Sequence, residues 1–294
     1  MARELKAVEP KIIKPPKPKI LLYGKPKTGK TYSAIEFPDC YVIDAEGGAS
    51  LDHYVEKMKK SNARYLGPAD GANDMDVVIE EVITLATTKH DRKTLVIDSL
   101  SKLINTQISK TLEHMERTGE KSAFGNEKKP AMQKFRRLIR WLDAIDMNIV
   151  IISHEKANWS NGEQVGVAPD APEKLEYELH LAFQIFEQGP SRKARVTASR
   201  YLQFPKNSIM DWSFDGFANQ FGRDIIFGDV KQLTLATTEQ IDRFKELIEA
   251  VKVDPKIMEK WADACDDIAD LTSEDIQKRI DWMAAKLPKV TVPS

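Results

Sequence analysis

Residues 24–31, GKPKTGKT, hold two glycines, a lysine and a threonine at spacings that suit the binding of a triphosphate. They fit the pattern G-x-x-x-x-G-K-[ST], in which Gly24 and Gly29 permit backbone angles that let successive N–H groups converge on phosphate oxygens. Lys30 is expected to reach the β and γ oxygens, and the Thr31 hydroxyl is expected to ligate Mg²⁺. An apolar run precedes the loop and a helix follows it, so a helix N-terminus also faces the anion. The residues expected to bind nucleotide here are Gly24, Lys25, Pro26, Lys27, Thr28, Gly29, Lys30, Thr31 and Tyr32.

Two carboxylates end predicted strands beside this loop. Asp98 ends the run TLVID, the usual place for a carboxylate that holds Mg²⁺ through water, and its alternative role is to cap the next helix. Glu46 ends the run YVIDAE, where a carboxylate can orient and deprotonate an attacking water. Asp44 competes for that role, but strand alternation points both side chains the same way, and only Glu46 sits at the carboxyl end.

His154 ends a further apolar strand beside the same crevice. Its imidazole is placed to contact a γ-phosphate and to relay the presence of that phosphate into the following loop. The alternative is a hydrogen-bonded structural histidine.

These residues follow the strands of a predicted α/β core. Apolar runs predict strands at residues 20–23, 40–46, 63–67, 93–100 and 148–154, and a hairpin at 181–202 that turns at Gly189–Pro190. Helical patterns lie between them, at residues 74–88, after the fourth strand to about residue 115, and near 130–145. Alternating strands and helices with continuous apolar strands indicate a mostly parallel sheet covered on both faces, the fold class of a P-loop NTPase.

After about residue 235 the pattern contains helices only. A capping box at Thr237 and Gln240, an N-cap at Asp254 before Pro255, and a start at Thr272 predict three short helices. The predicted domains are a flexible Lys/Pro-rich arm at 1–18, an ATPase core at 19–232 and an acidic helical module at 233–294.

Charge is segregated within a chain whose net charge is only −1. Residues 117–140 carry eight basic side chains against two acidic ones, which indicates an anionic partner met at a particular surface. The alternative is that such basic stretches are solvated helix faces. No apolar run reaches 18 residues and residues 1–19 lack the apolar stretch of a signal peptide, so neither a membrane span nor secretion is expected. Cys40 and Cys265 have no metal-ligand spacing and are expected to be reduced in a cytosolic protein.

Three segments resemble, in the same order, the corresponding segments of RecA-type recombinase cores: CYVIDAEGGASLDHYVEKM (40–58), TLVIDSLSKL (94–103) and NIVIISHEK (148–156). The Gly-Gly after Glu46 and a core that starts at the phosphate loop look more like phage-encoded RecA-like ATP-binding proteins, which are grouped with single-strand-annealing recombination proteins. The resemblance spans about residues 19–206. It implies that Glu46 is the catalytic carboxylate, Asp98 the Mg²⁺-holding acid and His154 the polar switch residue. Many recombinases have a glutamine at this last position, so His154 is a departure.

In the RecA-like arrangement, DNA is held by two loops, which here correspond to residues 116–137 and 155–172. Basic side chains there are expected to meet phosphates, and aromatic rings to stack on bases, a sequence-tolerant mode that suits single strands. The alternative is a pair of surface loops whose aromatic rings fold back onto the core. The candidate DNA-binding residues are Lys121, Phe124, Lys128, Lys129, Arg136, Arg137 and Trp159. Arg200 is the candidate for a residue that reaches the γ-phosphate of a neighbouring subunit, with Arg195 second.

The sequence therefore predicts a phage-encoded RecA-like ATPase of the bacterial host cytoplasm, with ATP and Mg²⁺ as cofactors and Glu46, Lys30 and Arg200 as catalytic residues. It is expected to form a homo-oligomeric ring or filament, to bind single-stranded DNA and to promote annealing or strand pairing. Its acidic helices are expected to dock a protein partner, such as a replication or single-strand-binding protein. Two alternatives stay open: a nucleotide-gated binding or loading module with little turnover, and a small-molecule kinase, for which no acceptor-pocket segment is evident.

Overall fold

The computed structural model describes residue 9 and residues 15–122, 125–160, 162–173, 175–264 and 267–287. Most of the predicted arm at 1–18, and Cys265, lie outside these ranges. The chain divides into two compact units, which are described one after the other. The first contains residues 1–70, 92–102 and 146–230, and the second contains residues 71–91, 103–145 and 231–294. Within the described ranges, no helix is both long enough and apolar enough to cross a membrane.

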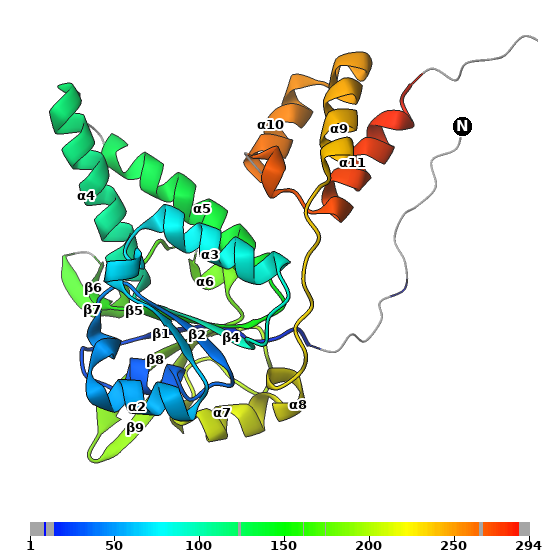
Figure 1. Ribbon diagram of the computed structural model, residues 1–294. Helices are drawn as coiled ribbons and strands as arrows, with labels where there is room; N and C mark the ends of the chain where they lie inside the picture. The colour runs from blue at the N-terminus through cyan, green and yellow to red at the C-terminus, as the bar shows by residue number, and fades with distance from the viewer. Residues whose placement is uncertain are drawn as a thin grey trace, which may run out of the picture. The chain divides into compact units, whose positions relative to one another are not determined.

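A mostly parallel sheet forms the centre of the first unit (Figure 1). Its strands lie in the order β10-β9-β8-β1-β5-β4-β2-β3. Neighbours from β8 to β3 are parallel, whereas β8–β9 and β9–β10 pair antiparallel. The strand bounds are β1 Lys19–Tyr23, β2 Cys40–Asp44, β3 Arg64–Leu66, β4 Thr94–Asp98, β5 Asn148–Ser153, β8 Leu181–Gln188, β9 Ser191–Ser199 and β10 Ile209–Asp211.

The central strands are apolar because both of their faces are buried. Every residue of β1, β4 and β5 is buried, as expected for parallel strands that are covered on both sides. The predicted strands, and the hairpin of β8 and β9 that turns at Gly189–Pro190, are confirmed. Because β1, β5, β4 and β2 are parallel neighbours, their carboxyl ends meet at one edge of the sheet.

Helices of the first unit pack against one face of this sheet. One core cluster joins alternate strand residues, among them Ile20, Leu22 and Val150, to Met58 of α2 and Phe217 of α7. Figure 1 shows α2, α7 and α8 on the same side of the sheet. The helical segments of this unit are α1 Lys30–Ala34, η1 Gly48–Ser50, α2 Asp52–Lys60, η2 Pro68–Asp70, α6 Leu175–Glu178, α7 Phe214–Phe221 and α8 Arg223–Ile226.

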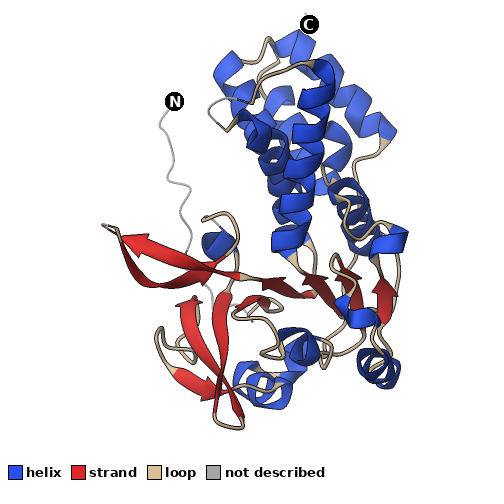
Figure 2. Cartoon of the chain, turned by 90° about the vertical axis from the view of Figure 1, so that its left-hand side faces the viewer, coloured by secondary structure: helices blue, strands red, loops and turns tan. Residues whose placement is uncertain are grey.

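Two further strands of the first unit, β6 (Glu155–Ser160) and β7 (Glu163–Pro169), pair with each other and not with the main sheet. Their hairpin extends away from the sheet (Figure 2). The prediction of a loop over residues 155–172 is therefore wrong for most of that segment. The first four residues of β7 are exposed, so the strand lacks the apolar alternation that identifies a half-buried strand.

The second unit is helical. The helix starts predicted at Thr237, Asp254 and Thr272 are confirmed, with the capping box of Thr237 and Gln240 complete. The helix α4 begins in the first unit and continues into the second. The segments are α3 Met75–Thr87, α4 Leu100–Thr118, η3 Asn126–Lys128, α5 Lys129–Ala144, α9 Thr238–Val251, α10 Pro255–Ala264, η4 Ile268–Asp270 and α11 Ser273–Ala284.

A buried carboxylate joins the C-terminal helices of this unit to α5. Arg137 donates two hydrogen bonds to Asp270, of 2.6 and 2.8 Å, and Arg140 donates a third of 2.6 Å. Burial alone would raise the pKa of Asp270, but the hydrogen bonds and charges of Arg137, Trp141 and Arg140 together lower it. The second unit therefore contains segments from the middle of the chain as well as residues 231–294, and the predicted domain bounds stay a prediction.

Candidate active site

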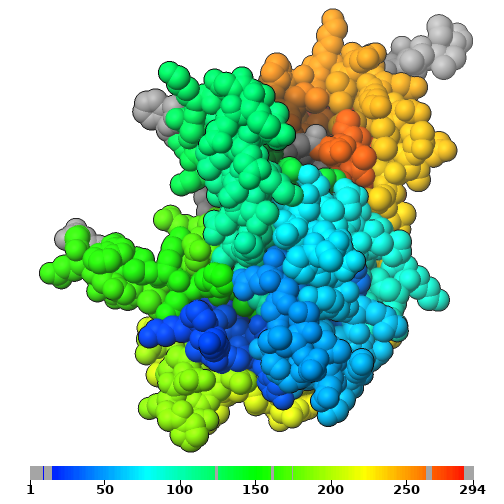
Figure 3. All heavy atoms as spheres, turned by 60° about the vertical axis from the view of Figure 1, so that its left-hand side comes forward, coloured from blue at the N-terminus to red at the C-terminus, as the bar shows by residue number. Residues whose placement is uncertain are grey.

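The phosphate loop connects β1 to α1 and fits closely against β8 and β9. Gly24 has φ +147° and Gly29 has φ +78°, conformations that side-chain-bearing residues rarely adopt. A β-carbon at residue 24 would lie 2.2 Å from the carbonyl oxygen of Ile185, and one at residue 29 would lie 2.2 Å from the Arg192 guanidinium. Gly24 is therefore required by space as well as by backbone angle, and Gly29 is required by backbone angle. Figure 3 shows this loop (dark blue) at the surface between the β6–β7 hairpin (green) and the β8–β9 region (yellow-green).

Lys30 lies buried across the loop. Its Nζ donates hydrogen bonds to the carbonyl oxygens of Gly24 (2.9 Å) and Lys25 (2.7 Å). Burial lowers the pKa of Lys30, and the nearby carboxylates, Asp98 foremost, act in the opposite direction. The ammonium group is thus held in the loop by two backbone oxygens, which a triphosphate oxygen can replace as partner.

The remaining loop residues divide by exposure. Thr28 is buried and its hydroxyl donates to the Lys25 carbonyl at 3.0 Å. Lys25, Pro26 and Lys27 form the exposed tip of the loop, and Tyr32 is also exposed.

Thr31 and Asp98 lie in direct contact. The Thr31 hydroxyl donates to Asp98 Oδ2 at 2.5 Å, and β4 ends with Asp98 almost fully buried. Burial raises the pKa of Asp98 to about 7, against the lowering effect of the Thr31 hydrogen bond. A hydroxyl and a carboxylate are hard oxygen donors, and Mg²⁺ typically takes one or two such protein ligands beside phosphates and waters. These two residues therefore fit a magnesium ion, whose charge would neutralise phosphate oxygens.

We expect Mg²⁺-ATP affinity to fall as the pH drops below 7. A carboxyl with a raised pKa carries a proton below that pKa, and a protonated Asp98 cannot serve as an anionic ligand. At pH 6, about one unit below the pKa of Asp98, the affinity for Mg²⁺-ATP should be about tenfold lower than at pH 8. Calorimetric titration from pH 6 to 8 measures this. Asp98→Asn, which cannot titrate, provides the baseline for protonation of the nucleotide itself, and an identical pH dependence in both proteins would contradict the assignment.

Asp44 organises the turn after β2. Its carboxylate accepts hydrogen bonds from the backbone N–H groups of Glu46 (3.0 Å), Gly47 (2.8 Å) and Ala49 (2.8 Å), and from the Tyr65 hydroxyl (3.1 Å). Both oxygens are occupied, and the residue is 1% exposed. Asp44 therefore holds the loop that presents Glu46, which is a positioning role.

Glu46 lies at the surface of the crevice and contacts two polar residues. Its Oε1 lies 2.6 Å from His154 Nε2 and accepts a hydrogen bond from the Ser99 hydroxyl. The carboxylate is 37% exposed and the imidazole 49%, so water reaches both. Glu46 and Asp98 are each close enough to Lys30 to influence its pKa. The structure thus brings together the predicted Lys30, Thr31, Asp98, Glu46 and His154 at the carboxyl edge of the sheet.

The backbone of His154 forms hydrogen bonds to the start of α4 and to the end of the β6–β7 hairpin. Its N–H donates to the Ser101 hydroxyl oxygen at 3.0 Å, and its carbonyl accepts from the Asp170 N–H at 2.8 Å. The Ser101 hydroxyl in turn donates to the Asp170 carbonyl at 2.8 Å. The hairpin base is therefore linked to the residue that touches Glu46.

The predicted DNA-binding residues lie in both units. Lys121, Lys128, Lys129 and Arg136 are exposed in the second unit, around the start of α5. Arg137 lies among them in sequence, but its guanidinium is paired with Asp270. Trp159 is 63% exposed on β6 in the first unit. Phe124 lies outside the described residues.

The two arginines predicted to act on a neighbouring subunit lie at the surface of the first unit. Arg200 donates a hydrogen bond to the carbonyl oxygen of Tyr177, and Arg195 lies over the Phe186 ring at 5.7 Å. Within the described part of the chain, neither forms a hydrogen bond, ion pair or ring contact with its own phosphate loop. Arg192, which lies beside Gly29 of that loop, has no sequence signal beyond its place in a basic stretch.

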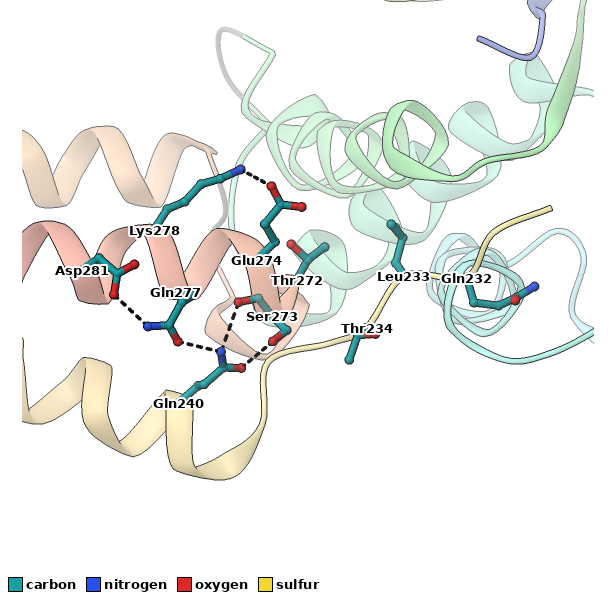
Figure 4. Close-up of a pocket in the computed structure, with 10 residues that line it drawn as sticks. All are labelled: Gln232, Leu233, Thr234, Gln240, Thr272, Ser273, Glu274, Gln277, Lys278 and Asp281. Carbon is teal, nitrogen blue, oxygen red and sulfur yellow. Dashed lines mark hydrogen bonds and ion pairs between the residues drawn. The ribbon is translucent and has the colours of Figure 1, made fainter. Parts of the chain in front are cut away.

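A polar groove of about 680 Å³ lies in the second unit, between the start of α9, α11 and residues 232–234 (Figure 4). Gln240 Nε2 donates to Gln277 Oε1 at 3.0 Å, and the Ser273 hydroxyl donates to Gln240 Oε1 at 3.0 Å. These side chains satisfy one another, and the groove contains none of the predicted site residues.

The family profile AAA_24, described as an AAA domain, matches residues 16–209, which covers the phosphate loop, Glu46, Asp98 and His154. The chain belongs to this AAA-domain family. Membership indicates a nucleotide-binding P-loop domain, and the chain has the predicted fold class, an α/β core with a mostly parallel sheet followed by C-terminal helices. Among solved structures, the crystal structure of the RadB recombinase matches with a TM-score of 0.43 and 16% identity, over 66% of this chain and 86% of that one. No curated protein matches the chain.

Proposed function

We propose that this AAA domain hydrolyses ATP with Mg²⁺, binds single-stranded DNA and promotes homologous recombination by annealing or strand pairing. The proposal is supported by a chain of polar contacts. It runs from the Glu46 carboxylate to the His154 imidazole, and from the His154 backbone through hydrogen bonds to Ser101 and Asp170 at the base of the β6–β7 hairpin. A γ-phosphate that accepts a hydrogen bond from His154, in place of Glu46, changes one end of this chain of contacts. The other end is a hairpin that exposes Trp159, an aromatic ring on which a base can stack.

The proposed chemistry assigns one role to each residue of the crevice. Lys30 and the loop N–H groups hold the β and γ phosphates, and Thr31 and Asp98 hold the metal ion. Glu46 accepts a proton from the attacking water, and Asp44 fixes the turn that presents it. The exposed Lys121, Lys128, Lys129 and Arg136 supply positive charge to DNA phosphates, independently of base sequence.

A specific contact favours a second candidate, a nucleotide-gated binding or loading module with little turnover. Glu46 has two polar partners within its own chain, Ser99 and His154. If these partners keep the carboxylate when ATP is bound, no base is available for water, and ATP serves only to set the position of the hairpin.

ATP turnover measured with and without single-stranded DNA decides between the two. We expect DNA to increase the rate, and to bind with an affinity that falls steeply as salt concentration rises. Lys128→Ala together with Lys129→Ala should make the negative slope of log affinity against log salt shallower by about 1.4. Each phosphate that a lysine neutralises on a single strand accounts for about 0.7 of that slope.

The matched control is Lys59→Ala together with Lys60→Ala, an adjacent exposed pair at the end of α2, which should leave the slope unchanged. Measurable DNA binding without turnover would support the gated module. Absence of DNA binding in every nucleotide state would rule out the recombination proposal and leave a gated module that binds a partner other than DNA.

The proposal extends to assembly and setting. We place this protein in a phage recombination system of the bacterial cytoplasm, as a ring or filament in which the exposed Arg200 of one subunit reaches the nucleotide of the next. The acidic helices after residue 233 are proposed to dock a replication or single-strand-binding protein. Molecular mass in solution with and without ATP and DNA tests the assembly.

A further inference from the structure

The β8–β9 hairpin fits against both glycines of the phosphate loop. Gly24 lies against the backbone of Ile185 in β8, and Gly29 lies against the side chain of Arg192 in β9. At residue 29 a β-carbon would lie 2.2, 2.4 and 2.5 Å from Nη2, Cζ and Nε of Arg192. The guanidinium therefore lies directly beside Gly29, where a side chain at residue 29 would displace it.

Strand alternation accounts for the direction of this arginine. Ala194 and Val196, two and four residues further along β9, are buried in the core of the first unit, and Arg192 shares their face. Lys193 and Arg195 take the other face, where Lys193 pairs with Asp211 at 2.7 Å and Arg195 lies over Phe186. Of these three basic residues, the sheet thus directs only Arg192 to the phosphate loop.

The Arg192 guanidinium has no carboxylate partner among the residues that the structure describes. The exposed ring of Tyr32 lies nearby, with its centroid 5.9 Å from Arg192 Cζ. Lys57 lies 3.6 Å from the same ring but is paired with Glu36. A guanidinium so placed beside a loop of converging N–H groups is suited to bind a phosphate, because its planar donors match two phosphate oxygens at once.

We propose that Arg192 is a nucleotide-binding residue that acts on the site of its own subunit, where it binds the α- or β-phosphate of ATP. The inference rests on the proposed function insofar as the P-loop must hold a nucleotide. Arg192 lies beside Gly29 and Tyr32, and among the described residues it forms no ion pair with Asp98, Glu46 or His154, whose partners are Thr31, Ser99 and each other. We therefore assign Arg192 to phosphates that ADP also carries, and leave the γ-phosphate to the carboxylate side of the site.

Calorimetric titration of ATP and ADP tests the assignment. Arg192→Ala should weaken both nucleotides by about 10- to 100-fold, the range for the removal of hydrogen bonds to a charged group. Arg192→Lys should recover part of this affinity, since it keeps the charge but loses the two-pronged geometry. Lys193→Ala is the matched control, one residue away on the opposite face, and should stay within about twofold. Thermal unfolding of each variant verifies that it is folded.

The outcomes separate this proposal from the nucleotide site itself. If Arg192→Ala binds both nucleotides as the parent does while Lys30→Ala does not, the site stands and the role of Arg192 is refuted. If Lys30→Ala also binds normally, the P-loop assignment fails first. A loss confined to ATP would contradict contact with the α- or β-phosphate.

A mixture of Arg192→Ala and Lys30→Ala chains distinguishes action on the same subunit from action on a neighbour. If Arg192 acts within its own chain, neither chain in the mixture has a complete site, and affinity stays low. Recovery of parental affinity in the mixture would show that the arginine is donated between subunits, and would overturn the proposal.

Discussion

Replacement of Lys30 by alanine is expected to weaken ATP binding by about 100-fold or more. The Lys30 ammonium donates to two loop carbonyls, and in the bound state it is the one buried cation of the described loop that can reach the β and γ phosphates. Two hydrogen bonds to a charged group are worth about 1.5–3 kcal/mol each, which sets this lower bound. Calorimetry with ATP and ADP measures the loss.

The control for Lys30 is Lys60→Ala, which removes an exposed lysine of α2 and should leave the affinity of the parent. Circular dichroism of Lys30→Ala shows whether the loop change disturbs the fold, because the carbonyls of Gly24 and Lys25 lose their donor. A folded Lys30→Ala protein with parental affinity would remove the phosphate-loop assignment.

The sheet and the residues at its edge were predictable because their signals are local. Continuous apolar runs end in Glu46, Asp98 and His154, and parallel strand order alone brings such ends together. The phosphate loop has a fixed spacing, so Lys30 and Thr31 could be assigned from eight residues. The helix caps at Thr237 and Thr272 are likewise local, and the first was found from Thr237 and Gln240, three positions on.

The parts of the fold and site that could not be predicted depend on contacts between residues that are far apart in the chain. Nothing local distinguishes Arg137, which pairs with an aspartate 133 residues away, from the exposed Arg136 beside it. Arg192 could not be assigned without the register of β9, because a shift by one residue would have turned Lys193 toward the loop instead. The β6–β7 hairpin was missed because strands that are exposed on both faces carry no apolar period.

Asp44 illustrates how the structure resolves a choice that sequence leaves open. Strand alternation places Asp44 and Glu46 on the same side, and position along the strand favours Glu46. The hydrogen bonds add a physical reason, because a carboxylate that accepts from three backbone N–H groups and a hydroxyl is committed to holding the turn. The Glu46 carboxylate is bonded only to the Ser99 and His154 side chains, which can exchange for water.

Replacement of Glu46 by glutamine is expected to lower ATP turnover by about 100-fold or more and to leave ATP affinity nearly unchanged. Lys30 and Thr31 hold the ground state, whereas a base that takes a proton from water matters at the transition state. Glutamine keeps the size of Glu46 and its hydrogen bond from Ser99, but it cannot accept a proton.

The matched control is Glu56→Gln, which changes an exposed residue of α2 and should retain full turnover. The ATP-bound Glu46→Gln protein should also retain single-stranded DNA at least as well as the parent, since the trapped state no longer decays. Parental turnover in Glu46→Gln would make Glu46 a structural strand-end residue. A parent protein without turnover at any DNA concentration would instead establish the gated binding module.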